Sequence, residues 1–374
     1  MKLDILVRGQ SNAILLMESD QYAAAIKLTA EVGRLLGFDG VTDKVDIRYE
    51  HGGEGHGTAY SGTALLGDWL QKDAAGTWQP AALEQSLLRS IAETPPRPDT
   101  AATAVLWLHS EDDSANANLT VGDWAAAVRQ DAALVRGALG GTAATISYHF
   151  VSAHPYSSGT DAGHQAIRLG MERLAADPAF HADIAARVLD IDTSHDNTDN
   201  NAATNEYGGP HISSGDAMTI AVRAAQAIAE DWSAFAKPGS PVALAGGAID
   251  DAGPQVVAAS RVAPDLLQLA VRHDVAAGFA PLGPGAASGL GWSVPGAAGT
   301  VEAAGVGILG PDTLRVRFDA PLPQDGVLHY GYGYGRLAEG NTPGQGNAVY
   351  DAGGLPIWTP AEGVALAPAA AWFL

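Results

Sequence analysis

Up to about residue 235, short runs of β-branched residues and leucine alternate with alanine-rich stretches whose apolar residues recur at helical spacing. A strand followed by a helix and a further strand is typical of βαβ units, which build a parallel sheet. Each strand-like run is short and bounded, as buried strands are. We therefore expect an α/β domain with strands at 3–7, 45–49, 104–108, 145–150 and 188–191, and helices at 22–36, 125–139, 163–174 and 216–235.

The character of the sequence changes at Lys237-Pro238-Gly239. Beyond this point the helical periodicity largely stops, and glycine and proline punctuate runs in which apolar and polar residues alternate. This pattern predicts an all-β sandwich. We expect an α/β domain at 1–236 and a β-sandwich accessory domain at 237–374, with strands within 255–262, 266–271, 313–318 and 327–332.

The chain is strongly acidic: its 374 residues include 42 acidic and 21 basic side chains, a formal net charge of -21. This charge repels nucleic-acid phosphates and anionic membrane surfaces, so we expect neither as a partner. Cysteine is absent, which excludes disulfides, thiolate catalysis and cysteine zinc sites. No apolar run approaches the roughly 20 residues of a membrane span, and the N-terminal residues do not form a signal-peptide core.

Ser11 follows the first predicted strand, in the segment Gly9-Gln10-Ser11-Asn12. Functional groups gather at the carboxyl ends of the strands in a parallel sheet, so this position suits a nucleophile. Serine is also a preferred helix N-cap, and a cap for the following helix is the alternative interpretation of Ser11.

Three further segments follow in the first domain, namely 61–63 (Ser-Gly-Thr) with Asp68-Trp69, 107–113 (Trp-Leu-His-Ser-Glu-Asp-Asp) and 208–211 (Gly-Gly-Pro-His). Together with the segment around Ser11, they resemble the sequence blocks of the SGNH hydrolases. The resemblance is to the branch of sialate O-acetylesterases and acetylxylan esterases, carbohydrate esterase family six. A β-sandwich tail with an Asp-x-x-Gly-x-Pro segment, here 351–356, also occurs in relatives.

The resemblance implies a flavodoxin-like three-layer α/β/α fold for the first domain and a carbohydrate O-acetylesterase activity. It implies that Ser11 is the nucleophile, that His211 is the general base, and that the N–H groups of Ser11 and Gly62 face the oxyanion. Serine esterases need a base within hydrogen-bond reach, and each oxyanion donor typically contributes about 3 kcal/mol. Without the resemblance, Gly62 is a turn glycine and His211 a loop histidine.

Two positions depart from that branch. His109 stands where the branch has a glutamine whose amide completes the oxyanion hole, and a histidine donates this hydrogen bond only in a suitable tautomer. Gly208 stands where the branch has an aspartate that orients the catalytic histidine. The loss of that carboxylate can lower the rate by orders of magnitude.

Other carboxylates are candidates for the missing acid. Glu206, five residues before His211, is the nearest, and Asp192 and Asp196 are further candidates. A Ser-His dyad is another possibility. His195 matches Asp-x-x-His literally, but no helix follows it directly, so it ranks after His211 as the base.

Four polar residues are expected to support the site: Gln10, Asn12, Glu111 and Asp113. We expect the last two to brace the loops by accepting backbone hydrogen bonds. Two carboxylates also occur in glycosidases, but a pair so close in sequence is more typical of a solvated turn.

We expect no metal and no cofactor. Aspartate and asparagine crowd residues 190–201, but the calcium-loop pattern of Asp-x-Asp-x-Asp-Gly is missing, which favours a polar loop. His51 and His56 lack a third ligand at a fixed spacing, so we place them near the mouth of the site. The aromatic residues of the tail predict either a sugar-stacking platform or, more commonly, core and cross-strand pairs: Trp292, Tyr330, Tyr332, Tyr334 and Trp358.

The sequence thus predicts a serine esterase that acts on an acylated carbohydrate. The alternatives are a non-catalytic glycan-binding or assembly protein and an esterase for longer acyl chains or polyesters. The substrates of relatives are usually extracellular, which slightly favours secretion over the cytoplasm. The sequence does not predict the sugar, the acyl length or the oligomeric state.

Overall fold

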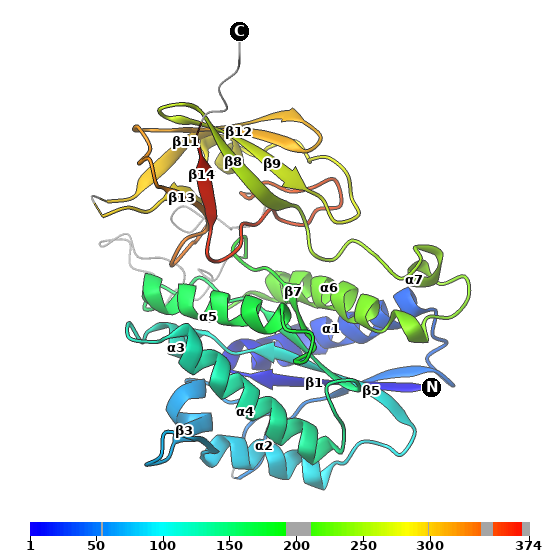
Figure 1. Cartoon of the computed structure of the whole chain (residues 1–374). Coiled ribbons are helices and arrows are strands. Elements are labelled where there is room, and N and C mark those ends of the chain that lie inside the picture. Colours follow the sequence, from blue (N-terminus) through cyan, green and yellow to red (C-terminus); the bar gives the residue numbers. More distant parts are fainter. Residues whose placement is uncertain (54, 192–210, 298, 338–346, 369–374) are drawn as a thin grey trace.

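The computed structural model describes residues 1–53, 55–191, 211–297, 299–337 and 347–368. These residues form an α/β part and a separate β-barrel (Figure 1). The α/β part has a five-stranded parallel sheet of order β2-β1-β5-β6-β7, which in chain order is the flavodoxin-like order 2-1-3-4-5. Its strands are β1 (Lys2–Gly9), β2 (Lys44–Arg48), β5 (Thr100–Leu108), β6 (Ile146–Val151) and β7 (Ala182–Ala186).

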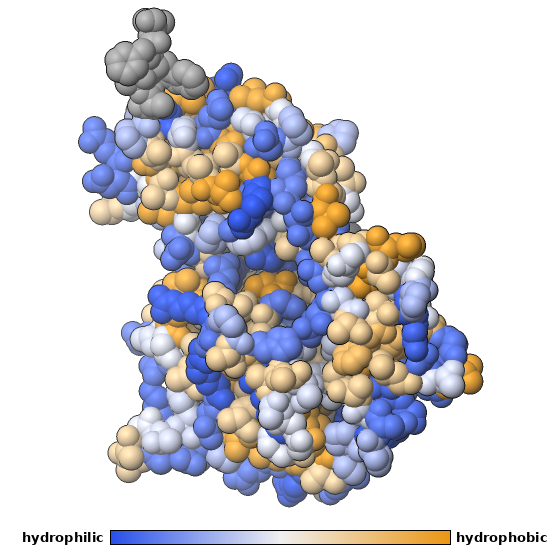
Figure 2. Space-filling model, turned by 45° about the vertical axis from the view of Figure 1, so that its right-hand side comes forward, coloured by the Kyte–Doolittle hydropathy of each residue, from blue (hydrophilic) through white to orange (hydrophobic). Residues whose placement is uncertain are grey.

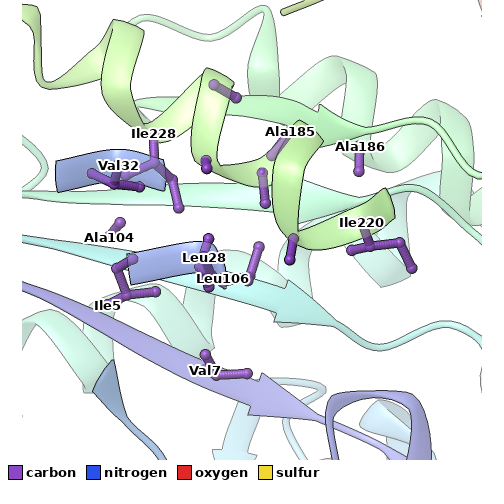
Figure 3. Close-up of a cluster of buried hydrophobic side chains, with 14 of the residues drawn as sticks. Ile5, Val7, Leu28, Val32, Ala104, Leu106, Ala185, Ala186, Ile220 and Ile228 are labelled. Carbon is purple, nitrogen blue, oxygen red and sulfur yellow. The ribbon is translucent and has the colours of Figure 1, made fainter. Parts of the chain in front are cut away.

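Helices cover both faces of this sheet and give three layers. On one face lie α1 (Ser11–Leu36) and α6 (Ser214–Asp231), and on the other lie α2 (Ala82–Glu93), α4 (Val121–Leu139) and α5 (Asp161–Ala175). In Figure 3 the strand residues Val7 and Leu106 lie in the same cluster as Leu28 of α1 and Ile220 of α6. Shorter elements are η1 (Leu65–Trp69), β3 (Leu70–Lys72), β4 (Trp78–Pro80), α3 (Glu111–Ser114), η2 (Ser233–Phe235) and α7 (Pro241–Leu244).

One predicted strand is wrong. Residues 188–191 form no strand, and β7 is the preceding segment Ala182–Ala186. Val188 and Ile191 are buried in the core beside α6, so their hydrophobicity reflects packing and not strand pairing. The alanine-rich β7 has a low strand propensity, which hid it from the sequence pattern.

Helix α1 starts earlier than predicted. It begins at Ser11 and is interrupted at Ser19–Tyr22, where Asp20, Gln21 and Tyr22 have positive φ. The predicted helix at 22–36 therefore matches the second half of α1, and the first half is a separate helical segment that carries Ser11.

The second part is a closed barrel and not the predicted sandwich, although its all-β class is confirmed. The strand order is β10-β11-β12-β9-β8-β14-β13. Closure depends on the pairing of β10 with β13 and on the parallel contact of β14 with β8, which local alternation does not encode. The elements are β8 (Gln255–Ala263), β9 (Leu266–Arg272), α8 (Pro284–Ser288), β10 (Trp292–Val294), β11 (Val301–Gly310), β12 (Thr313–Phe318), β13 (Val327–Tyr330) and β14 (Val364–Ala367).

The molecule narrows between its two parts (Figure 2). Polar side chains join the two parts. Arg168 of α5 donates hydrogen bonds to the carbonyl oxygens of Gly331 (2.8 Å) and Gly333 (2.6 Å), in the Gly-Tyr loop of residues 331–335. The Arg187 guanidinium lies 3.7 Å from the centroid of the Trp358 ring. Among the helices described, each is too short or too polar to span a bilayer.

The chain passes from one part to the other after residue 237. Val242 of α7 still belongs to the core of the α/β part, and the first barrel strand begins at Gln255. We retain the predicted division near residue 237 as a proposal.

Candidate active site

Ser11 lies where β1 ends and α1 begins. Gln10 is the residue before the helix, so Ser11 is the first helical residue and does not act as the N-cap. The first N–H groups of a helix have no intrahelical acceptor and carry partial positive charge, which suits them to a developing oxyanion. Gly9 is required by geometry: its φ is +151°, and a Cβ would overlap the carbonyl oxygen of Leu108 on the neighbouring strand.

The structure brings the His211 loop to the same place. His211 is half-buried and precedes α6, whose N-terminus is fixed by a capping box of Ser213 and Asp216. The backbone N–H of Ile212 donates to Oδ1 of Asn12 at 3.1 Å. The residue after the predicted base is therefore bonded to the residue after the predicted nucleophile.

The candidate acids lie outside the described residues. This holds for Glu206, Asp192 and Asp196, and also for the alternative base His195 and for Gly208. Asp190, the first residue of the aspartate- and asparagine-rich stretch 190–201, is described. Its carboxylate accepts two hydrogen bonds from Arg223 (2.9 and 2.7 Å) and one from the Tyr350 hydroxyl (3.0 Å). The identity of the triad acid stays a prediction.

A network of side-chain hydrogen bonds connects the segment around Ser11 to the end of β5, and it is made by Gln10, Asn12 and Glu111. The Gln10 Oε1 accepts hydrogen bonds from the N–H groups of Ser110 (2.8 Å) and Glu111 (3.1 Å), while its Nε2 donates to Asp112. The Asn12 Nδ2 donates to Oε1 of Glu111. Asn12 and Glu111 are buried, so this network fixes the backbone on both sides of Ser11.

Asp113 connects the end of β5 to the residues that follow Gly62. Its carboxylate accepts hydrogen bonds from the N–H groups of Leu65 (2.7 Å) and Leu66 (3.0 Å), which lie shortly after Gly62. Burial raises the pKa of Asp113 to about 7, although these two bonds oppose the shift.

Gly62 is exposed in a turn with φ +65°, and among the residues that the structure describes, apart from its own chain neighbours, none comes within 4 Å of a Cβ built there. The Tyr60 N–H donates to the Gly9 carbonyl at 3.1 Å, which holds this turn beside the end of β1. The left-handed backbone explains the glycine at this position.

His109 points into the protein. Its side chain has no exposed surface and packs against the rings of Trp69 (5.3 Å between centroids) and Trp107 (5.6 Å). Burial and the nearby Arg8 guanidinium keep the pKa of His109 well below its usual value, so the ring is neutral. Its Nδ1 is 3.8 Å from an oxygen of Asp113. In this conformation, His109 does not reach a substrate as the third oxyanion donor.

Arg8 and His154 are buried near the site, and sequence reasoning passed over both. The Arg8 guanidinium lies 4.4 Å from the ring centroids of both Trp69 and Trp107, and it pairs with Asp131. His154 follows β6, and its Nδ1 lies 3.4 Å from Oε1 of Glu111. The rule that functional groups follow parallel strands would have singled out His154, because it comes three residues after β6 ends.

The predicted mouth histidines are both exposed and paired with glutamates. His51 Nδ1 lies 2.9 Å from Glu18, and His56 Nδ1 lies 2.5 Å from Glu50. Across the residues that the structure describes, no group of three or more His, Asp or Glu side chains is arranged to hold a metal ion.

The fold of this chain aligns with those of several solved structures. It is similar to a carbohydrate acetylesterase from Xanthomonas citri, with a TM-score of 0.57, 15% identity and coverage of 95% of this chain and 79% of that chain. A protein assigned as an arylesterase from Agrobacterium tumefaciens aligns with a TM-score of 0.34 (16% identity; 61% and 98% covered). A family two carbohydrate esterase from Clostridium thermocellum, in complex with cellohexaose, aligns with a TM-score of 0.31 (10% identity; 63% and 65% covered).

Of these three alignments, the first has a TM-score above 0.5. Because it covers 95% of this chain, it shows a shared fold for the α/β part and the barrel together. No family model matches the chain, and no curated protein matches it. The resemblance to esterases is thus confirmed at the level of the fold, while the branch of sialate O-acetylesterases and acetylxylan esterases stays a prediction.

Proposed function

We propose that this protein is a serine esterase of the SGNH type that removes O-acetyl or other short acyl groups from a carbohydrate. The observation that carries the proposal is the bond between Asn12 and the Ile212 N–H, which holds the loops of Ser11 and His211 together at one edge of the sheet. The fold is shared with a carbohydrate acetylesterase, which supports an acylated sugar as the substrate. The net charge of -21 favours a neutral glycan over a polyanionic one.

The reaction proceeds through an acyl-enzyme. The Ser11 hydroxyl attacks the ester carbonyl carbon while His211 takes the hydroxyl proton, and the N–H groups of Ser11 and Gly62 stabilise the oxyanion. His211 then gives the proton to the sugar oxygen as its bond to the acyl carbon breaks, and the sugar leaves with a free hydroxyl. Water, deprotonated by His211, attacks the acyl-enzyme, and His211 returns that proton to the departing Ser11 oxygen, which releases the carboxylic acid and restores the Ser11 hydroxyl. Glu206 orients His211 in this proposal, and a Ser-His dyad is the variant without an acid.

The test is hydrolysis of chromogenic acetyl, butyryl and octanoyl esters and of an acetylated oligosaccharide. We expect the wild type to prefer the acetyl ester, and Ser11→Ala to lower kcat by about 10⁴-fold or more. Ser147→Ala is the matched control. Ser147 also bonds to a histidine (Oγ to His149 Nε2, 2.9 Å), with Asp183 on the other ring nitrogen, but it is 2% exposed and cannot reach substrate.

Activity that survives in Ser11→Ala would refute the nucleophile. A wild type that binds the acetylated oligosaccharide without releasing acetate would support the second candidate, a non-catalytic glycan-binding or assembly protein. The burial of His109 is the observation that favours that candidate, because it leaves the oxyanion with one donor fewer than in relatives. A preference for the octanoyl ester would indicate an esterase for longer acyl chains or polyesters.

A further inference from the structure

A chain of buried polar side chains runs beneath the candidate site from β6 to the His211 loop. Nδ1 of His154 lies 3.4 Å from Oε1 of Glu111, and the same oxygen accepts a hydrogen bond from Nδ2 of Asn12. Oδ1 of Asn12 in turn accepts the N–H of Ile212 at 3.1 Å. The exposed fractions are 1% for His154, 3% for Glu111 and 0% for Asn12, so no bulk water competes for these contacts.

The contact between His154 and Glu111 indicates which ring nitrogen of His154 carries the proton. An ionised carboxylate only accepts hydrogen bonds, so the contact with Glu111 is attractive when Nδ1 of His154 carries the proton. Burial lowers the pKa of His154, which favours the neutral ring. The other ring nitrogen, Nε2, has no hydrogen-bond partner among the described residues. A buried polar atom without a partner costs free energy, so packing alone does not account for a histidine here.

We propose that His154 is a positioning residue for the esterase reaction: it orients Glu111, which orients Asn12, which holds the backbone at Ile212 and so places His211 against Ser11. The inference rests on the proposed function. Asn12 and Ile212 are the chain neighbours of Ser11 and His211, so a rotation of the Asn12 amide would uncouple the nucleophile from its base. The second oxygen of Glu111 accepts the Ser110 N–H at 3.1 Å, which leaves Oε1 for Asn12 and His154.

Two substitutions of His154 distinguish the effect of its hydrogen bond from the effect of the volume of its ring. His154→Asn keeps an N–H donor close to the position of Nδ1, whereas His154→Leu fills similar space without a donor. His164→Leu is the matched control, because His164 is also fully buried, but its Nδ1 contacts the Thr160 carbonyl (2.9 Å) and not Glu111. His154→Ala replaces His154→Leu if the latter does not fold, which thermal unfolding will show.

We expect His154→Leu to lower kcat for the acetyl ester by about 10- to 100-fold with KM changed less than about twofold, since a misplacement of about 1 Å can cost 100-fold. His154→Asn should stay within about threefold of the wild type, and His164→Leu should leave kcat unchanged. A merely structural role would instead predict the same loss in His154→Asn and His154→Leu, or the same loss in His164→Leu, and either result would overturn the proposal.

The second measurement does not depend on activity. The amide hydrogen of Ile212 should exchange slowly with deuterium in the wild type, in His154→Asn and in His164→Leu, and about tenfold or more faster in His154→Leu. Unchanged exchange in His154→Leu would contradict the chain of contacts. If the wild type hydrolyses no ester, the proposed function fails by itself, and the exchange rates still decide whether His154 holds this loop.

Discussion

The buried His149 of β6 should make the stability of this protein depend on pH in the alkaline range. Its Nδ1 lies 2.9 Å from Oδ2 of Asp183, and its Nε2 lies 3.6 Å from Oδ2 of Asp231. Burial by itself lowers the pKa of His149, but the two carboxylates outweigh it and raise the pKa to about 10.

The direction of the pH effect follows from this shift. The pKa of His149 in the folded protein exceeds the unfolded value of 6.5, so folding is favoured while the ring is protonated. This stabilisation is complete below about pH 6.5 and is lost as the pH rises toward 10. The full shift sets an upper limit of about 5 kcal/mol. Asp183 is about one-third exposed and therefore screened by water, so we expect His149→Gln to cost about 2–3 kcal/mol near pH 6.

The assay is urea unfolding, followed by circular dichroism at about pH 6 and about pH 9. The difference in the free energy of unfolding between the wild type and His149→Gln should fall by about two-thirds between these pH values. His273→Gln is the control, because the His273 ring contacts the Pro311 carbonyl (2.7 Å) in the barrel. An equal difference at both pH values, or none near pH 6, would show that His149 is not stabilised as an imidazolium.

Two further substitutions test the fold around the site. Gly9→Ala should destabilise the α/β part by about 3 kcal/mol or more and lower its unfolding temperature, because the new Cβ overlaps the Leu108 carbonyl at a positive φ. Arg168→Met should cost about 3 kcal/mol, because it removes the buried donor to the carbonyls of Gly331 and Gly333. Limited proteolysis should then cut between the barrel and the α/β part, and an uncut Arg168→Met protein of unchanged stability would contradict this.

The parallel sheet was predictable because β1, β5 and β6 are local apolar runs that are each followed by a helix. The barrel was only half predictable. Alternating residues gave the strands β8, β9, β12 and β13, but closure requires Trp292 to pair with Tyr330 across a long stretch of chain. Pairing between distant segments leaves no local pattern, so sequence reasoning arrived at the commoner sandwich.

The sequence motifs gave the positions of Ser11, at the end of the first strand, and of His211, in a loop before a helix, and their catalytic roles stay predictions. The partners of the site's buried groups were not predictable, since Asn12 bonds to Glu111 and to Ile212, which lie 99 and 200 residues further along the chain. The orientation of His109 was not predictable either. It depends on Trp69, which reaches His109 from the separate η1 segment.

The contacts of the barrel bear on its role. The aromatic residues that could have formed a sugar platform are largely committed to packing: Trp292 and Tyr330 lie in the barrel core with ring centroids 4.5 Å apart, and Trp358 lies under Arg187. Arg168, which binds the Gly-Tyr loop of the barrel, also donates to the Ala153 carbonyl at 3.3 Å. Ala153 directly precedes His154 in the β6–α5 connection. The barrel is therefore bonded to the same connection that carries His154, which argues for support of the site by this domain over stacking of sugars on these rings.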